Sequence, residues 1–79
     1  MRQISIRLRG VQEVLAFVSL STSRSFPIRV SSPRHQVNGK NFLEMFCLNL
    51  REPLTVTFQC SDEEYQQFCL DADRFLVSH

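Results

Sequence analysis

Residues 37–54 read Val-Asn-Gly-Lys-Asn-Phe-Leu-Glu-Met-Phe-Cys-Leu-Asn-Leu-Arg-Glu-Pro-Leu, and this segment is the most informative part of the chain. Its apolar side chains recur at intervals of three and four residues, at Phe42, Met45, Phe46 and Leu50. Such spacing predicts a short amphipathic helix, which Pro53 and the residue before it bring to an end. The Asn-Gly pair ahead of it is a turn signal. The segment therefore predicts a turn followed by a helix.

Upstream of this segment, the pattern predicts a strand, a longer helix and two more strands. Apolar and polar residues alternate from Gln3 to Leu8, as in a strand with one face on a core. The period then changes, and the expected inner face of a helix consists of Val11, Val14, Leu15 and Val18. The Ser/Thr cluster at 21–23 ends that helix. Alternation around Ile28 predicts a second strand, and residues 35–37 predict a brief third one.

Downstream, residues 54–60 alternate cleanly and predict a fourth strand. Ser61 and Glu64 have the spacing of a capping box, with acidic residues in the first helical turn. The expected inner face of this last helix consists of Tyr65, Phe68, Cys69, Ala72, Phe75 and Leu76. The element order is β-α-β-β-α-β-α. It predicts one α+β domain spanning residues 1–79, an antiparallel four-stranded sheet with three helices on one face.

Composition supports one small domain without a cofactor or a metal. The 79 residues are 43% hydrophobic and include seven Phe, which is enough for a single packed core. The three cysteines form no Cys-x-x-Cys pair, and there is no N-terminal signal pattern, so we expect a reducing cytoplasm. We expect Cys47, Cys60 and Cys69 to be small buried apolar residues. No apolar run approaches the ~18 residues of a membrane span.

Charge is unevenly distributed along the chain. Residues 1–40 hold seven of the nine basic residues and one of the eight acidic ones. We expect the two halves to interleave in the fold, so that their charges largely neutralise. The alternative is a small nucleic-acid-binding module whose phosphate contacts would be Arg2, Arg7, Arg9, Arg29 and Arg34. It lacks the aromatic and glycine motifs of ribonucleoprotein domains.

The segment 37–54 resembles the second helix of the histidine-containing phosphocarrier (HPr) family, and the match in spacing runs without a gap from Phe17 to about Leu50. The resemblance implies the HPr-like open-faced sandwich. Family members carry a phosphoaccepting histidine in Gly-x-His-x-Arg-Pro, where the first strand meets the first helix. Here residues 7–12 read Arg-Leu-Arg-Gly-Val-Gln, so Arg9 or Gly10 occupies the histidine position. Glu13 falls nearest the missing proline, and its carboxylate would repel a phosphate.

The resemblance also identifies the start of the second helix. The family's regulatory serine is replaced by Asn41, which has no hydroxyl to phosphorylate and is expected to cap the helix instead. Family members present this helix to partner proteins, and Phe42, Leu43 and Phe46 match the docking positions. The alternative is that Phe42 and Phe46 fill the core of a small domain.

These observations predict a function without phosphotransfer. We expect a non-enzymatic, HPr-like protein that binds or regulates a protein partner through its second helix, related to the bacterial phosphoenolpyruvate-dependent sugar phosphotransferase system. His35 is the one residue that could support an unconventional phosphate site, and we expect an exposed edge-strand histidine without such a role. His79 is expected to be mobile.

Overall fold

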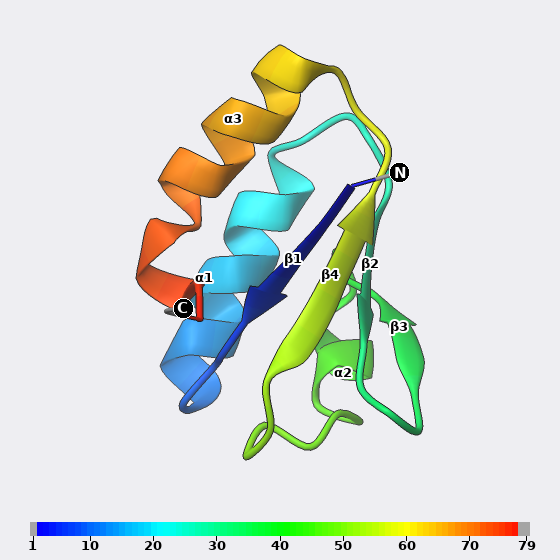
Figure 1. The fold of residues 1–79 in the computed structure, drawn as a ribbon. Coiled ribbons are helices and arrows are strands. Elements are labelled where there is room, and N and C mark those ends of the chain that lie inside the picture. Colours follow the sequence, from blue (N-terminus) through cyan, green and yellow to red (C-terminus); the bar gives the residue numbers. More distant parts are fainter. Residues whose placement is uncertain (1, 78–79) are drawn as a thin grey trace.

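A four-stranded antiparallel sheet, covered by helices on one face, organises residues 2–77, the part of the chain that the computed structural model describes (Figure 1). The elements are β1 (Arg2–Ile6), α1 (Val11–Thr22), β2 (Ile28–Ser31), β3 (Gln36–Asn38), α2 (Phe42–Met45), β4 (Leu54–Phe58) and α3 (Asp62–Asp71), followed by the 3-10 turn η1 (Asp73–Phe75). This order and the one-sided arrangement confirm the predicted α+β fold. His79 lies outside the described residues.

The strands lie in the order β1-β4-β2-β3, so the first and last strands of the chain are neighbours. Ile4 pairs with Val56 of β4, which in turn pairs with Val30 of β2. The segment after η1 returns to the outer edge of β1, where the Val77 N–H donates to the Ser5 carbonyl at 3.0 Å. That contact partly covers an edge that would otherwise be open.

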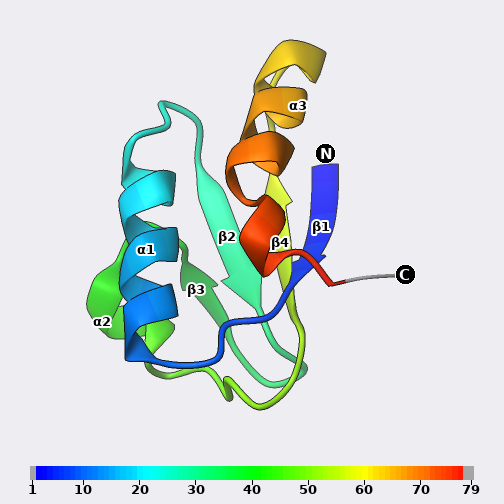
Figure 2. The same cartoon turned by 90° about the vertical axis from the view of Figure 1, so that its left-hand side faces the viewer.

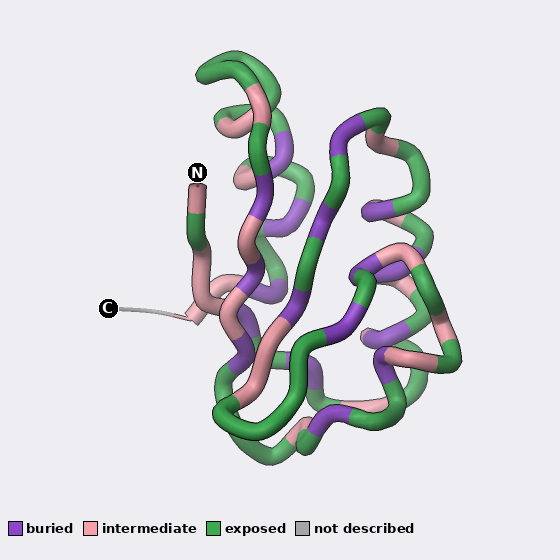
Figure 3. Tube along the Cα trace, turned by 90° about the vertical axis from the view of Figure 1, so that its right-hand side faces the viewer, coloured by how far each residue is buried: buried purple, intermediate pink, exposed green. Residues whose placement is uncertain are grey.

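Alternation along the strands separates a buried face of the sheet from an exposed one (Figure 3). In β4, Leu54, Val56 and Phe58 point into the core, and the two threonines between them point away. Across the core, Phe68 of α3 lies 5.0 Å from Phe58 between ring centroids. The helix layer and the sheet are therefore joined largely through aromatic side chains.

The buried side of α1 differs from the prediction at two positions. Val14 and Val18 are buried as expected, together with Phe17 and Ser21, but Val11 and Leu15 are 56% and 46% exposed. The physical reason is Phe17, a large side chain that contacts Phe68 and Phe75 edge-on. Its burial rotates the helix so that the i, i+4 pair of Val11 and Leu15 lies outside the core.

The second helix is shorter than predicted, because α2 ends at Met45 and does not continue to Leu50. The Cys47 N–H donates to the Glu44 carbonyl at 3.0 Å, and the Leu48 N–H to the Met45 carbonyl at 3.3 Å. These i to i−3 bonds replace α-helical ones and tighten the chain into turns. The turns bury Leu48 alongside Met45.

The last helix begins where the sequence predicts. Ser61 Oγ accepts from the Glu64 N–H at 3.2 Å, and Glu64 Oε1 accepts from the Ser61 N–H at 2.9 Å, which is the reciprocal capping box. Of the predicted inner face, Phe68 is buried within α3, while Tyr65 and Cys69 are half-buried. Ala72 and Phe75, also buried, follow the end of the helix.

The close packing of Gly39 against β2 can be tested by substitution. Its N–H donates to the Ile28 carbonyl at 2.8 Å, and a Cβ at this position would lie 2.8 Å from Ile28 Cγ2. We expect Gly39→Ala to lower the free energy of unfolding by about 1–3 kcal/mol through overpacking, measured by urea denaturation. Gly10→Ser is the matched control, because no atom lies within 4 Å of a Cβ there. Equal free energies of unfolding for Gly39→Ala and Gly10→Ser would contradict the overpacking expected at Gly39.

Candidate functional site

The β1–α1 junction holds no imidazole, and a carboxylate sits at the start of the helix. Gly10 is the N-cap residue of α1 and contributes no side-chain cap. The Arg9 N–H donates to Glu13 Oε1 at 2.9 Å, so the first turn of α1 supplies its own acidic group. The positive end of the helix dipole, which would attract an external anion, is thereby partly neutralised.

His35 is exposed and precedes β3 on the β2–β3 connection, where its N–H donates to Ser32 Oγ at 3.3 Å. Within residues 2–77, no group of three or more His, Cys, Asp or Glu side chains could hold a metal ion. No helix in the same range is long and apolar enough to cross a membrane.

Asn41 caps α2, as predicted. Its Oδ1 accepts from the Glu44 N–H at 3.1 Å, and its Nδ2 donates to Glu44 Oε2 at 2.9 Å. Glu44 Oε1 also accepts from the Asn38 N–H at 3.1 Å, which ties the helix start to β3. Asn41 therefore has a structural role at the start of α2.

The three predicted docking residues of the second helix differ in exposure. Leu43 is 76% exposed and Phe46, next to the end of α2, is 40% exposed, whereas Phe42 is half-buried and packs against the core. The Phe42 and Phe46 rings meet edge-on, with centroids 4.8 Å apart. Phe42 thus supports the Phe46 ring, which remains 40% exposed.

Two exposed residues of α1 extend this apolar surface. Phe17 directs one side of α1 toward α3, and α1 lies between α3 and α2 (Figure 2). Helical spacing places Val11 and Leu15 beyond Val18, on the flank away from Phe17, and α1 contacts α2. We call Val11, Leu15, Leu43 and Phe46 the α1–α2 apolar patch. Periodicity alone missed the two α1 residues because it assigned them to the core.

The cysteines are only partly as predicted. Cys47 is exposed, which contradicts its expected burial; it lies in the turn after α2, where the apolar face is occupied by Met45 and Leu48. Cys60 and Cys69 are half-buried. Burial, together with the nearby Glu64 carboxylate, raises the pKa of the Cys60 thiol above its usual value. A thiol with a raised pKa is protonated at neutral pH and is a poor nucleophile.

Two ion pairs join the basic and acidic halves of the chain, Arg2 with Asp62 and Arg24 with Asp71. The Arg2 guanidinium also lies 4.9 Å from the centroid of the Tyr65 ring. Of the arginines in the nucleic-acid alternative, Arg2 is therefore committed to α3. Interleaving thus neutralises part of the charge asymmetry, but exposed arginines remain elsewhere.

Comparison with known proteins supports the fold. No family model matches the chain, and no curated protein matches it in sequence. Among solved structures, HPr-C-His from Thermoanaerobacter tengcongensis superposes with a TM-score of 0.73 at 19% identity, over 91% of this chain and 90% of that one. The phosphocarrier protein HPr from Bacillus anthracis str. Ames gives 0.62 at 20% identity, over 90% of each chain. The chain therefore has an HPr-like fold.

The contribution of the Asn41 cap to stability can be measured by substitution. We expect Asn41→Ala to lower the free energy of unfolding by about 1 kcal/mol, because the Glu44 N–H loses its acceptor. Asn41→Ser is the matched variant and should retain most of the stability, since a serine hydroxyl caps equally well. Thermal unfolding of both variants measures the effect, and an unchanged midpoint in the alanine variant would show that this cap does not contribute.

Proposed function

We propose that this chain is a cytoplasmic, HPr-like protein that does not transfer phosphate and instead binds a protein partner through the α1–α2 apolar patch, as a regulatory module related to the bacterial sugar phosphotransferase system. The observation that carries the proposal is the combination of a β1–α1 junction without an imidazole and an exposed apolar surface directly beside it.

The first support comes from chemistry at the junction. A phosphoimidazole forms only on a ring nitrogen with a free lone pair, and the junction offers Arg9 and Gly10. A guanidinium stays protonated in proteins and has no lone pair to attack phosphorus. Glu13 adds a negative charge at the same helix end, where it accepts from the Arg9 N–H. The junction therefore lacks a nucleophile for phosphoryl transfer, and the Glu13 carboxylate repels a phosphoryl group.

The second support comes from the patch. Four apolar side chains on neighbouring elements are 40–76% exposed, an arrangement that water disfavours by about 25 cal/mol for each Å². Phe46 is held by its edge-on contact with Phe42, so it loses little conformational freedom on binding. Rigid aromatic side chains of this kind are frequent anchors in protein interfaces.

Phosphotransfer can be tested directly. We expect no transfer of label when the protein is incubated with the general phosphotransferase enzyme of a bacterial sugar phosphotransferase system and labelled phosphoenolpyruvate, because no imidazole occupies the junction. A histidine-containing HPr in the same assay shows that the enzyme is active. Acid-labile label that disappears in the His35→Ala variant would contradict the proposal and assign the chemistry to the β2–β3 connection.

Binding can be tested with two leucines of similar exposure. Leu43 in the patch is 76% exposed, and Leu70 on α3 is 72% exposed. We expect Leu43→Ala and Leu70→Ala each to leave the free energy of unfolding within about 0.5 kcal/mol of the wild type. Immobilised wild type and Leu70→Ala should then retain the same proteins from a lysate of the source organism, and Leu43→Ala should lose them.

One outcome of this binding experiment would contradict the proposal. Identical sets of retained proteins for both leucine variants would place binding outside the patch. Phe42→Ala serves as the core reference, because a phenylalanine that packs against the core should cost up to about 3–5 kcal/mol of stability when truncated.

A further inference from the structure

The sheet face opposite the helices has a chemistry that the proposed function does not use. Strand register places its outward side chains in two rows: Gln3, Thr57, Arg29 and Asn38 in one, and Ser5, Thr55, Ser31 and Gln36 in the other. Arg29 is the only charged residue in either row. All eight acidic residues lie on helices, on η1 or in the loop before β4. The face therefore offers hydrogen-bonding groups around one positive charge.

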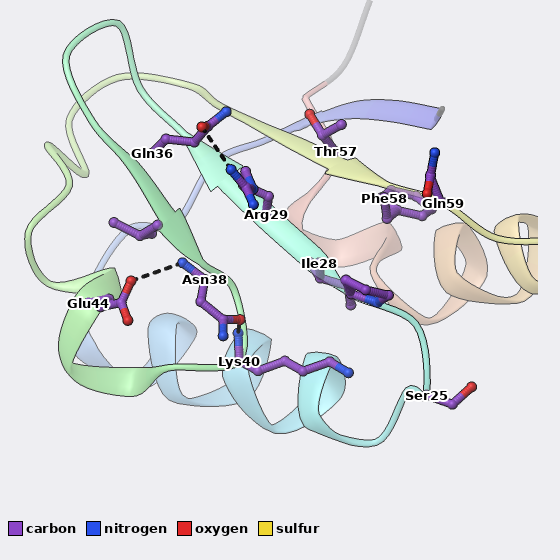
Figure 4. A pocket seen from close by; sticks show the side chains of 12 residues that line it. Ser25, Ile28, Arg29, Gln36, Asn38, Lys40, Glu44, Thr57, Phe58 and Gln59 are labelled. Carbon is purple, nitrogen blue, oxygen red and sulfur yellow. Dashed lines mark hydrogen bonds between the residues drawn. The ribbon is translucent and has the colours of Figure 1, made fainter.

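A hollow of about 890 Å³ lies over one part of this face, at β2, β3 and the end of β4 (Figure 4). Its polar lining includes Ser25, Arg29, Gln36, Asn38, Thr57 and Gln59. Sites for small molecules typically measure about 300–1,000 Å³, so the hollow has room for one such molecule.

The Arg29 guanidinium is available to a ligand. Its Nη1 donates to Gln36 Oε1 at 3.1 Å, which holds the side chain over the face (Figure 4). Among the described residues, no carboxylate lies within ion-pair distance of it, unlike Arg2 and Arg24. A guanidinium has five N–H donors in a planar fork that matches phosphate and carboxylate oxygens. Four of these donors remain after the bond to Gln36.

The side-chain amides of Gln36 and Asn38, next to Arg29, can act as hydrogen-bond donors to a ligand. Gln36 Oε1 is engaged by Arg29, and Asn38 Oδ1 accepts from the Lys40 N–H at 2.9 Å. Each amide oxygen thus already accepts one hydrogen bond, and both NH₂ groups are available. The Thr57 hydroxyl adds a further donor. A surface in which donors outnumber free acceptors favours an oxyanion.

Two opposite charges border the hollow. Lys40 Nζ donates to the Arg24 carbonyl at 2.6 Å and keeps two more N–H groups. Glu44 is the one carboxylate in the lining, and both of its oxygens already accept hydrogen bonds, from the Asn38 N–H and from Asn41 Nδ2. The charges of the lining sum to a net positive value.

We propose that this hollow binds a small phosphate monoester, with the phosphate on the Arg29 guanidinium and a hydroxylated body against Thr57, Asn38 and Gln59. Apart from Lys40 and Glu44 at the start of α2, the polar lining belongs to the strands β2, β3 and β4 and to the residues that flank them. The lining holds two cations, Arg29 and Lys40, and one carboxylate, Glu44, a net charge that suits one phosphate group. Neither row contains an aromatic residue on which a nucleic-acid base could stack. A small ester therefore fits better than a polynucleotide.

The test is an NMR titration of the ¹⁵N-labelled protein with ribose 5-phosphate, with ribose as the matched neutral probe. We expect a Kd of about 1 mM and shifts centred on the amides of Arg29, Gln36 and Thr57, with no shifts from ribose. Arg29→Gln should weaken binding at least about tenfold, and Arg29→Lys should bind with intermediate affinity because it keeps the charge and loses the fork. Arg74→Gln, an exposed arginine on η1, should bind like the wild type.

Four results would overturn the proposal: no shifts, shifts centred on the start of α1, equal binding by Arg29→Gln, or equal shifts from ribose. A single-stranded oligonucleotide is titrated in the same way as a second candidate ligand. Tighter binding of the oligonucleotide than of ribose 5-phosphate, with a steep loss in added salt, would replace the monoester with a nucleic acid as the ligand. The spectrum of each variant before titration confirms that it is folded.

Discussion

The aromatic contacts between Phe17, Phe58, Phe68 and Phe75 set the arrangement of this domain. They join one helix, one strand, a second helix and the closing 3-10 turn, and all four residues are 2% exposed or less. In a domain of this size the buried fraction is only about 60%, so a few large side chains contribute much of the apolar burial. The rotation of α1 about its axis follows from the place of Phe17 in this cluster.

That rotation has a consequence at the surface. Phe17 is directed toward α3, whereas Val11 and Leu15 on α1 are exposed, as are Leu43 and Phe46 at α2. An apolar patch then forms from residues that a helical wheel would partly assign to the core. One-sided coverage of the sheet creates a second surface of opposite character, because the side chains that alternate with the buried ones are hydroxyls, amides and Arg29. The two surfaces therefore differ in their chemistry.

The start of α1 at the β1–α1 junction is formed without an imidazole. The helix start needs acceptors for its free N–H groups and a compatible backbone, and it does not need an imidazole. Gly10 adopts an extended conformation there, and Glu13 accepts a hydrogen bond from the Arg9 N–H. In the same way, Asn41 supplies at α2 the cap that a serine would supply. Both helix starts are therefore supported locally, by Glu13 at α1 and by Asn41 at α2.

The sequence by itself determined the element order and the caps at Asn41 and Ser61, because each depends on neighbours a few residues away. The single-sided α+β architecture follows from the element order. The lack of a histidine at the junction is read directly from the sequence. Only the tertiary structure decided which residues of each helix are exposed. It showed that Val11 and Leu15 lie outside the core, that Phe42 supports Phe46, and that α2 ends at Met45 so that Cys47 is exposed. It also brought Arg29, Gln36 and Thr57 together from three strands without an acidic neighbour in either row. The physical reason is that periodicity defines a face of a helix only to within its width, while large side chains from distant segments set its rotation, and strand register sets which polar residues share a surface.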